Sequence, residues 1–311
     1  MLCPAERGVC GGTGGLSGLD SLADVRSSGV GPPEPVELLA LDIDGTLLDR
    51  KGRLPSRNAE AIRSAMERRV LVVLASARPP RALLGIYKQL QLRTAVISYN
   101  GAMVYDPPSR QLLLHRPIEA DLARSIIEAA RSVHPETLVH VERLNRWLTD
   151  RHDPAYNTET GKLFPPDVVA PLETWLTEPV TKLMLLGEPA RLDEVRRHIE
   201  HRYARQIGGS GSDRPIRLLQ TDRHLLQLQN PLSSKALAVA LVASFYGVRR
   251  ERVMAVGDAL NDYGMLRWSG FGVAMGNAMP ELLGVADAVT GSNDQAGLAE
   301  AIERWVLGSA G

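Results

Sequence analysis

The chain has 311 residues, of which 44% are apolar and 23% are charged, a balance typical of globular proteins. Its 36 basic and 36 acidic residues cancel, which argues against a partner such as nucleic acid or an anionic membrane. No apolar run approaches the roughly 18 residues that a membrane span requires, and the only cysteines, Cys3 and Cys10, exclude a disulfide framework. We therefore expect a cytoplasmic protein, either a monomer or a weak homodimer, without nucleic-acid or membrane partners.

Residues 1–35 are rich in Gly, Ser and Pro and show neither helical nor strand periodicity, so they predict a flexible leader. These residues either belong to the mature protein or lie upstream of the true start. The run Gly11–Gly15 follows no strand and lacks Gly-Lys-Ser/Thr, so it is not a phosphate-binding loop. Acidic residues in the leader argue against a transit peptide, although targeting to an organelle stays open.

The first chemically informative stretch is the apolar run Val36–Leu41, which ends on Asp42 and Asp44. Runs of this length are typical of buried parallel strands, whose carboxyl ends face the ligand crevice of α/β proteins. Two adjacent carboxylates repel unless a cation, a proton or hydrogen bonds intervene. Oxygen ligands favour Mg²⁺, and a pair of acids can divide nucleophilic attack and proton transfer between them.

A second strand is predicted over Val70–Ala75, after a helix that begins with Ser56 as its N-cap and continues to Arg69. This strand ends on Ser76 and Ala77. A hydroxyl and free backbone N–H groups at a strand-to-helix turn suit a phosphate oxygen. Considered alone, a serine at such a turn is more typical of a helix N-cap.

Thr94–Ser98 predicts a third strand, and Asn100-Gly101 predicts a hairpin turn that leads into a strand over Ala102–Tyr105. A further short strand is expected over Gln111–His115. Turn chemistry and a functional role explain Asn100 about equally well.

Residues 117–229 differ in character and predict an inserted α+β unit. All seven histidines of the chain lie in this unit or just before it. Their spacing is not that of metal ligands, so we interpret them as surface or packing residues. Residues 151–178 are expected to be irregular, and a flexible loop is expected at Gly208–Ser212. The remaining predicted elements are helices over Leu122–Val133 and Leu192–Tyr203 and strands over 137–141, 146–149, 180–186, 216–220 and 224–229.

The parallel unit resumes with a helix that Ser233 or Ser234 caps and whose first turn contains Lys235. A lysine there opposes the helix dipole, so a nearby anion would stabilise it. The apolar run Val253–Val256 then leads through Gly257 to Asp258. Strands over 271–277 and within 288–307, and a closing helix, complete the chain.

Four segments together resemble the signatures of the haloacid dehalogenase-like phosphatases, and specifically the Cof-type subfamily with a large cap. They are Asp-x-Asp-Gly-Thr at 42–46, the strand-terminal Ser76, Lys235, and Gly-Asp-x-x-Asn-Asp at 257–262. Three positions depart from the subfamily pattern: Ser76 replaces Thr, and Ala77 and Ala236 replace Gly. The resemblance implies an α/β fold: a doubly wound, mostly parallel (Rossmann-like) core formed by residues 36–116 and 230–311. An α+β cap over 117–229 would be inserted into this core.

The resemblance also implies phosphoryl transfer from a small phosphorylated metabolite, either a sugar phosphate or a phosphorylated cofactor, through an aspartyl-phosphate. Asp42 would attack, Asp44 would protonate the leaving oxygen and later deprotonate water, and Lys235 would offset negative charge. Ser76, the Ala77 amide and Asn261 would hold the phosphoryl oxygens. Mg²⁺ would be bound by Asp42, Asp258 and the carbonyl of Asp44, with Asp262 and Thr46 in supporting positions.

Two alternatives share these residues. A phosphomutase would use the same aspartyl-phosphate but transfer the phosphoryl group to a sugar. A non-catalytic sensor would keep the phosphate contacts but lack the nucleophile or acid, and the presence of Asp42 and Asp44 argues against it. The cap would select the substrate, and its loops contain no recognisable motif.

Overall fold

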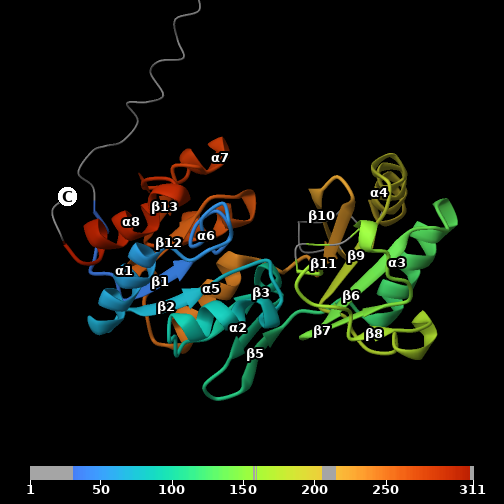
Figure 1. The fold of residues 1–311 in the computed structure, drawn as a ribbon, viewed down its shortest axis with the longest axis horizontal. Coiled ribbons are helices and arrows are strands. Elements are labelled where there is room, and N and C mark those ends of the chain that lie inside the picture. The colour runs from blue at the N-terminus through green and yellow to red at the C-terminus, as the bar shows by residue number, and fades with distance from the viewer. Residues whose placement is uncertain (1–30, 157, 159, 205–214, 309–311) are drawn as a thin grey trace, which may run out of the picture.

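The computed structural model describes residues 31–156, 158, 160–204 and 215–308 (Figure 1). Most of the predicted leader, residues 1–30, and the predicted loop Gly208–Ser212 lie outside these described residues. In the part of the chain that is described, no helix has the length and apolar character needed to cross a bilayer.

The core is built on a five-stranded sheet in which every neighbouring pair is parallel, with the order β14-β13-β12-β1-β2. A parallel bridge between Ala75 and Ile97 places a sixth strand, β3 (Val96–Ser98), beyond β2. The strands of the sheet are β1 (Leu38–Leu41), β2 (Leu71–Leu74), β12 (Val253–Gly257), β13 (Phe271–Ala274) and β14 (Ala288–Val289).

Helices cover both faces of this sheet, as the alternation of side chains along β1 requires. Leu39 and Leu41 pack on one face against α1 (Ser56–Glu67), α2 (Pro80–Gln89) and α8 (Gly297–Trp305). Leu38 and Ala40 pack on the other face against α5 (Lys235–Phe245), α6 (Tyr263–Trp268) and α7 (Pro280–Leu283). The predicted doubly wound parallel core is therefore confirmed (Figure 1).

A hairpin follows β3 and leads into β4 (Met103–Asp106) and β5 (Gln111–His115), as predicted. Its turn is tight, because Tyr99, Asn100 and Gly101 all have positive φ. At Gly101 a Cβ would lie 2.2 Å from the Ser234 carbonyl oxygen. Only glycine therefore allows this turn to approach the start of α5, the helix that carries Lys235.

The cap contains a six-stranded sheet with the order β10-β11-β9-β6-β7-β8, antiparallel except for the β7–β8 pair. Its strands are β6 (Leu138–Arg143), β7 (Arg146–Thr149), β8 (Val168–Val169), β9 (Lys182–Leu186), β10 (Arg217–Asp222) and β11 (Leu225–Gln229). The apolar residues of one face, among them Val139 and Leu183, pack against α3 (Ala120–Val133) and α4 (Pro189–Ala204).

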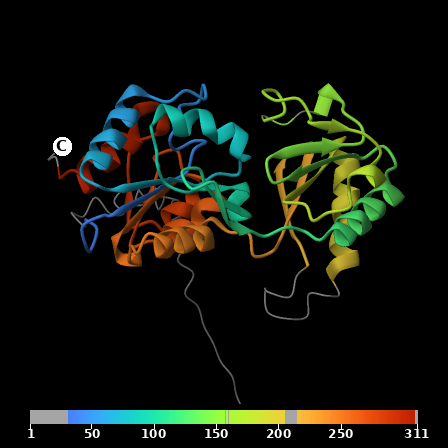
Figure 2. The ribbon, with the colours of Figure 1, turned by 90° about the horizontal axis from the view of Figure 1, so that it is seen from below.

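Two chain segments join the core to the cap, one after β5 and one after β11, and they lie close together (Figure 2). Asn230 Nδ2 donates to the Pro117 carbonyl at 2.8 Å, and Arg116 donates to the Leu232 carbonyl. These bonds tie the two segments to each other. The domain limits at 36, 117 and 230 remain predictions.

The structure corrects several local predictions. Ser56 is not the N-cap of α1: the helix begins at Ser56 itself, and Pro55 occupies the cap without a side-chain bond. The strand-to-helix turn after Ser76 implied a helix without giving its bounds; the structure places α2 there, with proline in its first turn, where proline is well suited. Residues 151–178, expected to be irregular, include β8, which pairs with β7.

Candidate active site

The site lies at the carboxyl ends of β1 and β12, which are neighbours in the sheet. The register pairs Leu41 with Val256, and the Asp42 amide donates to the Val256 carbonyl at 3.0 Å. Asp42 and Asp258 therefore emerge side by side, although 216 positions separate them in the sequence. This is the edge of the sheet at which α/β proteins bind ligands.

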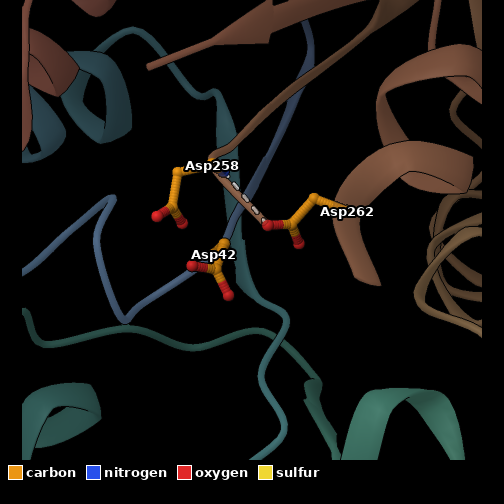
Figure 3. Close-up of side chains that lie close together, drawn as sticks. All are labelled: Asp42, Asp258 and Asp262. Atoms are coloured by element: carbon orange, nitrogen blue, oxygen red, sulfur yellow. Dashed lines mark hydrogen bonds between the residues drawn. The ribbon is translucent and has the colours of Figure 1, made fainter. Parts of the chain in front are cut away.

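Three carboxylates converge there: oxygen atoms of Asp42, Asp258 and Asp262 all lie within 4.8 Å of one another (Figure 3). Asp42 and Asp262 are buried, at 5% and 0% exposure. Burial, followed by the charge of Asp262, raises the pKa of Asp42 well above its usual value. The same two causes raise the pKa of Asp258 to about 6. Such a cluster requires positive charge nearby if its members are to ionise at neutral pH.

Lys235 supplies one such charge from the first residue of α5. Its Nζ lies 2.5 Å from Asp42 Oδ1 and 2.6 Å from Asp262 Oδ1, and its side chain is fully buried. Although burial alone would lower the pKa of Lys235, the charges of Asp262 and Asp42 raise it. The ammonium is therefore held charged between two buried acids.

Asp262 fixes the loop that follows β12. Its Oδ2 accepts hydrogen bonds from the amides of Asp258 and Ala259, both at 3.1 Å. At Gly257 a Cβ would lie 2.5 Å from the Asp262 Cβ, which explains the glycine at this position. Since Lys235 binds its other oxygen, Asp262 has both oxygens engaged by the protein.

Asp258 is positioned by two further side chains. Thr46 Oγ1 donates to its Oδ1 at 3.2 Å, and Asn277 Nδ2 lies 3.3 Å from its Oδ2. Asn277 Nδ2 also donates to the Gly45 carbonyl at 2.9 Å. Gly45 has a φ of 83°, and a Cβ there would lie 2.1 Å from Asp258 Oδ2. The glycine that follows the acid pair is thus required by the close approach of Asp258.

Asp44 stands apart from this cluster. Its carboxylate forms a two-pronged ion pair with the Arg78 guanidinium, in which Nε lies 2.8 Å from Oδ2 and Nη2 contacts Oδ1. The Asp44 side chain is 57% exposed, whereas Asp42 is buried. The two acids of the motif therefore face different surroundings, as a division between nucleophile and proton donor requires.

Ser76 is buried at the end of β2, and its Oγ accepts a hydrogen bond from the Arg78 amide at 3.2 Å. Its carbonyl accepts a hydrogen bond from the Asn100 amide at 2.9 Å. Ala77 is partly buried beside it, and its amide has no partner within the described residues. The side chain of Asn100 has a partner of its own: Asn261 Nδ2 donates to Asn100 Oδ1 at 3.0 Å.

Comparison with known proteins assigns this arrangement to a family. The family model of the haloacid dehalogenase-like hydrolases matches residues 39–302. The chain belongs to this family. The predicted resemblance is thereby confirmed, and the chain is a phosphoric monoester hydrolase of the Cof-type subfamily.

Two curated relatives of this phosphatase match along nearly their whole length. The 5-amino-6-(5-phospho-D-ribitylamino)uracil phosphatase YitU of Bacillus subtilis (strain 168) is 26% identical over 273 residues, covering 86% of this chain and 97% of the relative. The HMP-PP phosphatase of Serratia proteamaculans (strain 568) is 26% identical over 278 residues, covering 86% and 95%. A haloacid dehalogenase-like hydrolase from Bacteroides thetaiotaomicron superposes with a TM-score of 0.77 at 28% identity, covering 86% and 99%.

The core of the phosphatase also contacts its cap through a buried ion pair. Arg81 on α2 binds Glu142 on β6 through its two terminal guanidinium nitrogens, at 2.5 and 2.8 Å. The Tyr99 hydroxyl donates to Glu142 Oε2 at 3.1 Å and to the Leu144 carbonyl at 2.6 Å. Arg81 and Tyr99 adjoin the segments that carry Arg78 and Asn100, so the cap is bound beside the cluster of acids.

Sequence reasoning missed four residues of this region of the phosphatase: Arg78, Arg81, Asn277 and Gln229. Gln229 Nε2 donates to the Tyr99 carbonyl at 2.7 Å and, together with Asn100 and Asn261, forms a chain of side-chain amides. Arg78 stands in the segment Ser76–Pro79, which resembles the subfamily's Thr-Gly-Arg-Pro pattern, so a signal was available although no role was assigned to it. Arg81, Asn277 and Gln229 are brought there only by tertiary contacts.

Proposed function

We propose that this phosphatase is Mg²⁺-dependent and hydrolyses a small phosphorylated metabolite through an aspartyl-phosphate on Asp42. One observation carries the proposal: a buried carboxylate at a strand end bonded to a buried lysine, 2.5 Å away, with a second acid beside it. A carboxylate in this position can act as a nucleophile, because its partners hold it in place and offset the charge of an incoming phosphate.

The donor set fits Mg²⁺. Asp42 and Asp258 would hold the ion together with the carbonyl of Asp44, while Asp262, whose oxygens bind Lys235 and two amides, braces the loop. All of these donors are oxygen atoms, which hard divalent cations prefer. The raised pKa of Asp42 and of Asp258 fits a site that is completed by a further cation. When bound, Mg²⁺ would neutralise the phosphate oxygens and favour ionised carboxylates.

In the first half-reaction, an Asp42 oxygen attacks phosphorus while the bond from phosphorus to the ester oxygen breaks. Asp44, once protonated and released from its ion pair with Arg78, gives its proton to that departing oxygen. In the second half-reaction, Asp44 takes a proton from water, whose oxygen attacks phosphorus, releasing inorganic phosphate and free Asp42. Lys235, Ser76, the Ala77 amide and Asn261 would hold the phosphoryl oxygens throughout.

The proposed class of substrate, a small phosphorylated metabolite, is supported by the relatives. The names of the two relatives describe phosphatases of small phosphorylated compounds, and this chain covers nearly all of their length. We further propose that the protein acts in the cytoplasm as a monomer or weak homodimer. Its partner would be a small phosphorylated metabolite.

The test is release of free phosphate from a panel of phosphorylated metabolites, with and without Mg²⁺, by wild-type protein and by Asp42→Asn. We expect Mg²⁺-dependent release that Asp42→Asn abolishes. Formation of an isomeric sugar phosphate without free phosphate would indicate a mutase instead. Turnover by Asp42→Asn at the wild-type rate would overturn the assignment of the nucleophile.

A further inference from the structure

The face of the cap sheet opposite α3 and α4 is unusually polar for a buried surface. Lys182 on β9 pairs in register with Glu142 on β6, so both side chains lie on this face. Lys182 is 8% exposed and Glu142 is 4% exposed. Further along the same face, both ring nitrogens of His140 and the Trp147 Nε1 are buried without a hydrogen-bond partner. Buried polar groups without partners are rare and call for an explanation.

Lys182 has no counter-ion of its own on this face. Glu142 has both oxygens bound by Arg81, and one of them also accepts the Tyr99 hydroxyl. The Lys182 ammonium makes no hydrogen bond or ion pair within the described residues, although the charge of Glu142 acts on it. Burial, the largest cause, lowers the pKa of Lys182 to about 8, so at neutral pH it remains mostly charged. Asp167 acts on Arg81 as a second anion, but the anion that acts on Lys182 is Glu142, whose two oxygens Arg81 already binds.

The Lys182 ammonium lies on the cap side of the proposed phosphoryl site, beside the Arg81–Glu142 pair that joins the core to the cap. Arg81 lies in the first turn of α2, three residues after Arg78, which binds Asp44. Tyr99 precedes Asn100, which pairs with Asn261. In the proposed reaction, Asp44 protonates the leaving oxygen, so the leaving group departs on the side of Asp44 and Arg78. The group that reaches the cap face is therefore part of the leaving group.

We propose that Lys182 is a specificity-determining residue that binds an anionic group on the leaving portion of the substrate. This inference rests on the proposed function. It makes the preferred substrate a phosphate ester with a second negative group, either a carboxylate or a second phosphate. A neutral polyol would leave the ammonium without a counter-charge in a buried environment, which is costly.

Matched pairs of substrates test the proposal in the full-length protein. Glycerol 3-phosphate and 3-phosphoglycerate differ by a carboxylate, and fructose 6-phosphate and fructose 1,6-bisphosphate differ by a second phosphate. We expect wild-type kcat/KM to favour the anionic member of at least one pair by roughly ten- to hundredfold, the range of a charge-assisted hydrogen bond. The responding pair identifies the anion.

Lys182→Met should bring that ratio close to one, and Lys182→Arg should keep most of it. Lys88→Met, on an exposed lysine of α2, serves as the matched control and should keep the full ratio. Because each variant is compared on two substrates, a loss of correctly folded protein cancels from the ratio. A wild-type ratio near one in both pairs, or an unchanged ratio in Lys182→Met, would overturn the proposal.

A binding measurement separates this inference from the proposed function. Calorimetric titration of the Asp42→Asn protein with fructose 1,6-bisphosphate and fructose 6-phosphate, and with the glycerol-based pair, reports recognition without turnover. Tighter binding of an anionic member that is lost on adding Lys182→Met supports the proposal even if p-nitrophenyl phosphate is not hydrolysed by the wild type. Equal binding within both pairs contradicts it even if hydrolysis occurs.

Discussion

Lys235 and Asp42 form a fully buried ion pair, with Nζ 2.5 Å from Oδ1, that joins the start of α5 to the end of β1. Lys235→Met keeps the length of the side chain but leaves Asp42 and Asp262 as neighbouring buried acids. Removing one partner of a buried pair costs roughly 3–5 kcal/mol of stability. We expect a loss of that size in the free energy of urea unfolding at pH 7, together with loss of phosphatase activity. A variant that retained wild-type stability would show that the pair contributes nothing.

Removal of the proposed Mg²⁺ should affect the same cluster of carboxylates. EDTA should abolish phosphate release, and added Mg²⁺ should restore it, because one lysine cannot offset three converging carboxylates and an incoming phosphate. A ligand that binds only the folded state also raises its stability. Mg²⁺ should therefore raise the Tm of the wild type, and it should raise that of Asp258→Asn much less. Full activity after exhaustive chelation would contradict the metal assignment.

The order of core elements could be predicted from the sequence because each strand is a short apolar run that ends on a polar group. Asp42, Ser76 and Asp258 all follow such runs, and parallel strands bring their carboxyl ends to one edge. Sequence reasoning missed the residues that only tertiary contacts bring to that edge. Asn277 reaches Asp258 from the loop after β13, and Gln229 reaches Tyr99 from the end of the cap sheet. No local pattern marks either residue.

The lack of a separate counter-ion for Lys182 could not be predicted for the same reason. Lys182 and Glu142 are 40 positions apart, and only the antiparallel register of β6 and β9 places them on one face. Arg81 then reaches Glu142 from the core, which decides that Lys182 has no acceptor of its own. The irregular character of residues 151–178 was predicted correctly in part. The strand β8 within this segment forms only by pairing with β7, and no pattern in the segment's own sequence indicates it.

His140 should make the stability of the protein sensitive to acid. Burial, followed by the charge of His152, lowers the pKa of His140 to about 4, against about 6.5 in an unfolded chain. Between these two pKa values the unfolded state binds more protons than the folded state. The contribution of His140 to the free energy of unfolding is therefore fully present above pH 6.5 and is lost as the pH falls toward 4. From pH 7 to pH 5 this one group should remove about 2 kcal/mol of unfolding free energy.

His140→Phe keeps a ring of similar shape beside Trp147 and removes the titration. The free energy of urea unfolding should therefore fall less in this variant than in the wild type between pH 7 and pH 5. Other titrating groups, such as Asp258, are common to both proteins and cancel from the difference. Equal slopes in the two proteins would show that His140 is not held neutral in the folded state.

The division of labour between Asp42 and Asp44 gives the most discriminating prediction. Asp42→Asn removes the nucleophile but keeps its shape, so no phosphoenzyme should form and turnover should fall by several orders of magnitude. Asp44→Asn removes the proton shuttle alone, since its backbone carbonyl remains. General acid–base catalysis contributes roughly 10² to 10⁴ in rate, and turnover should fall by that factor with an alkyl phosphate.

The leaving group separates the two roles further. p-Nitrophenolate leaves without much protonation, so Asp44→Asn should still form phosphoenzyme from p-nitrophenyl phosphate. That intermediate should persist, because the hydrolytic water has lost its base. Rapid acid quenching followed by mass spectrometry should detect an added phosphoryl group on Asp44→Asn and none on Asp42→Asn. Arg78→Gln provides a matched control: it breaks the ion pair with Asp44 but keeps both acids, so its phosphoenzyme should form and turn over. A phosphoenzyme on Asp42→Asn would require a different nucleophile and would overturn the assignment.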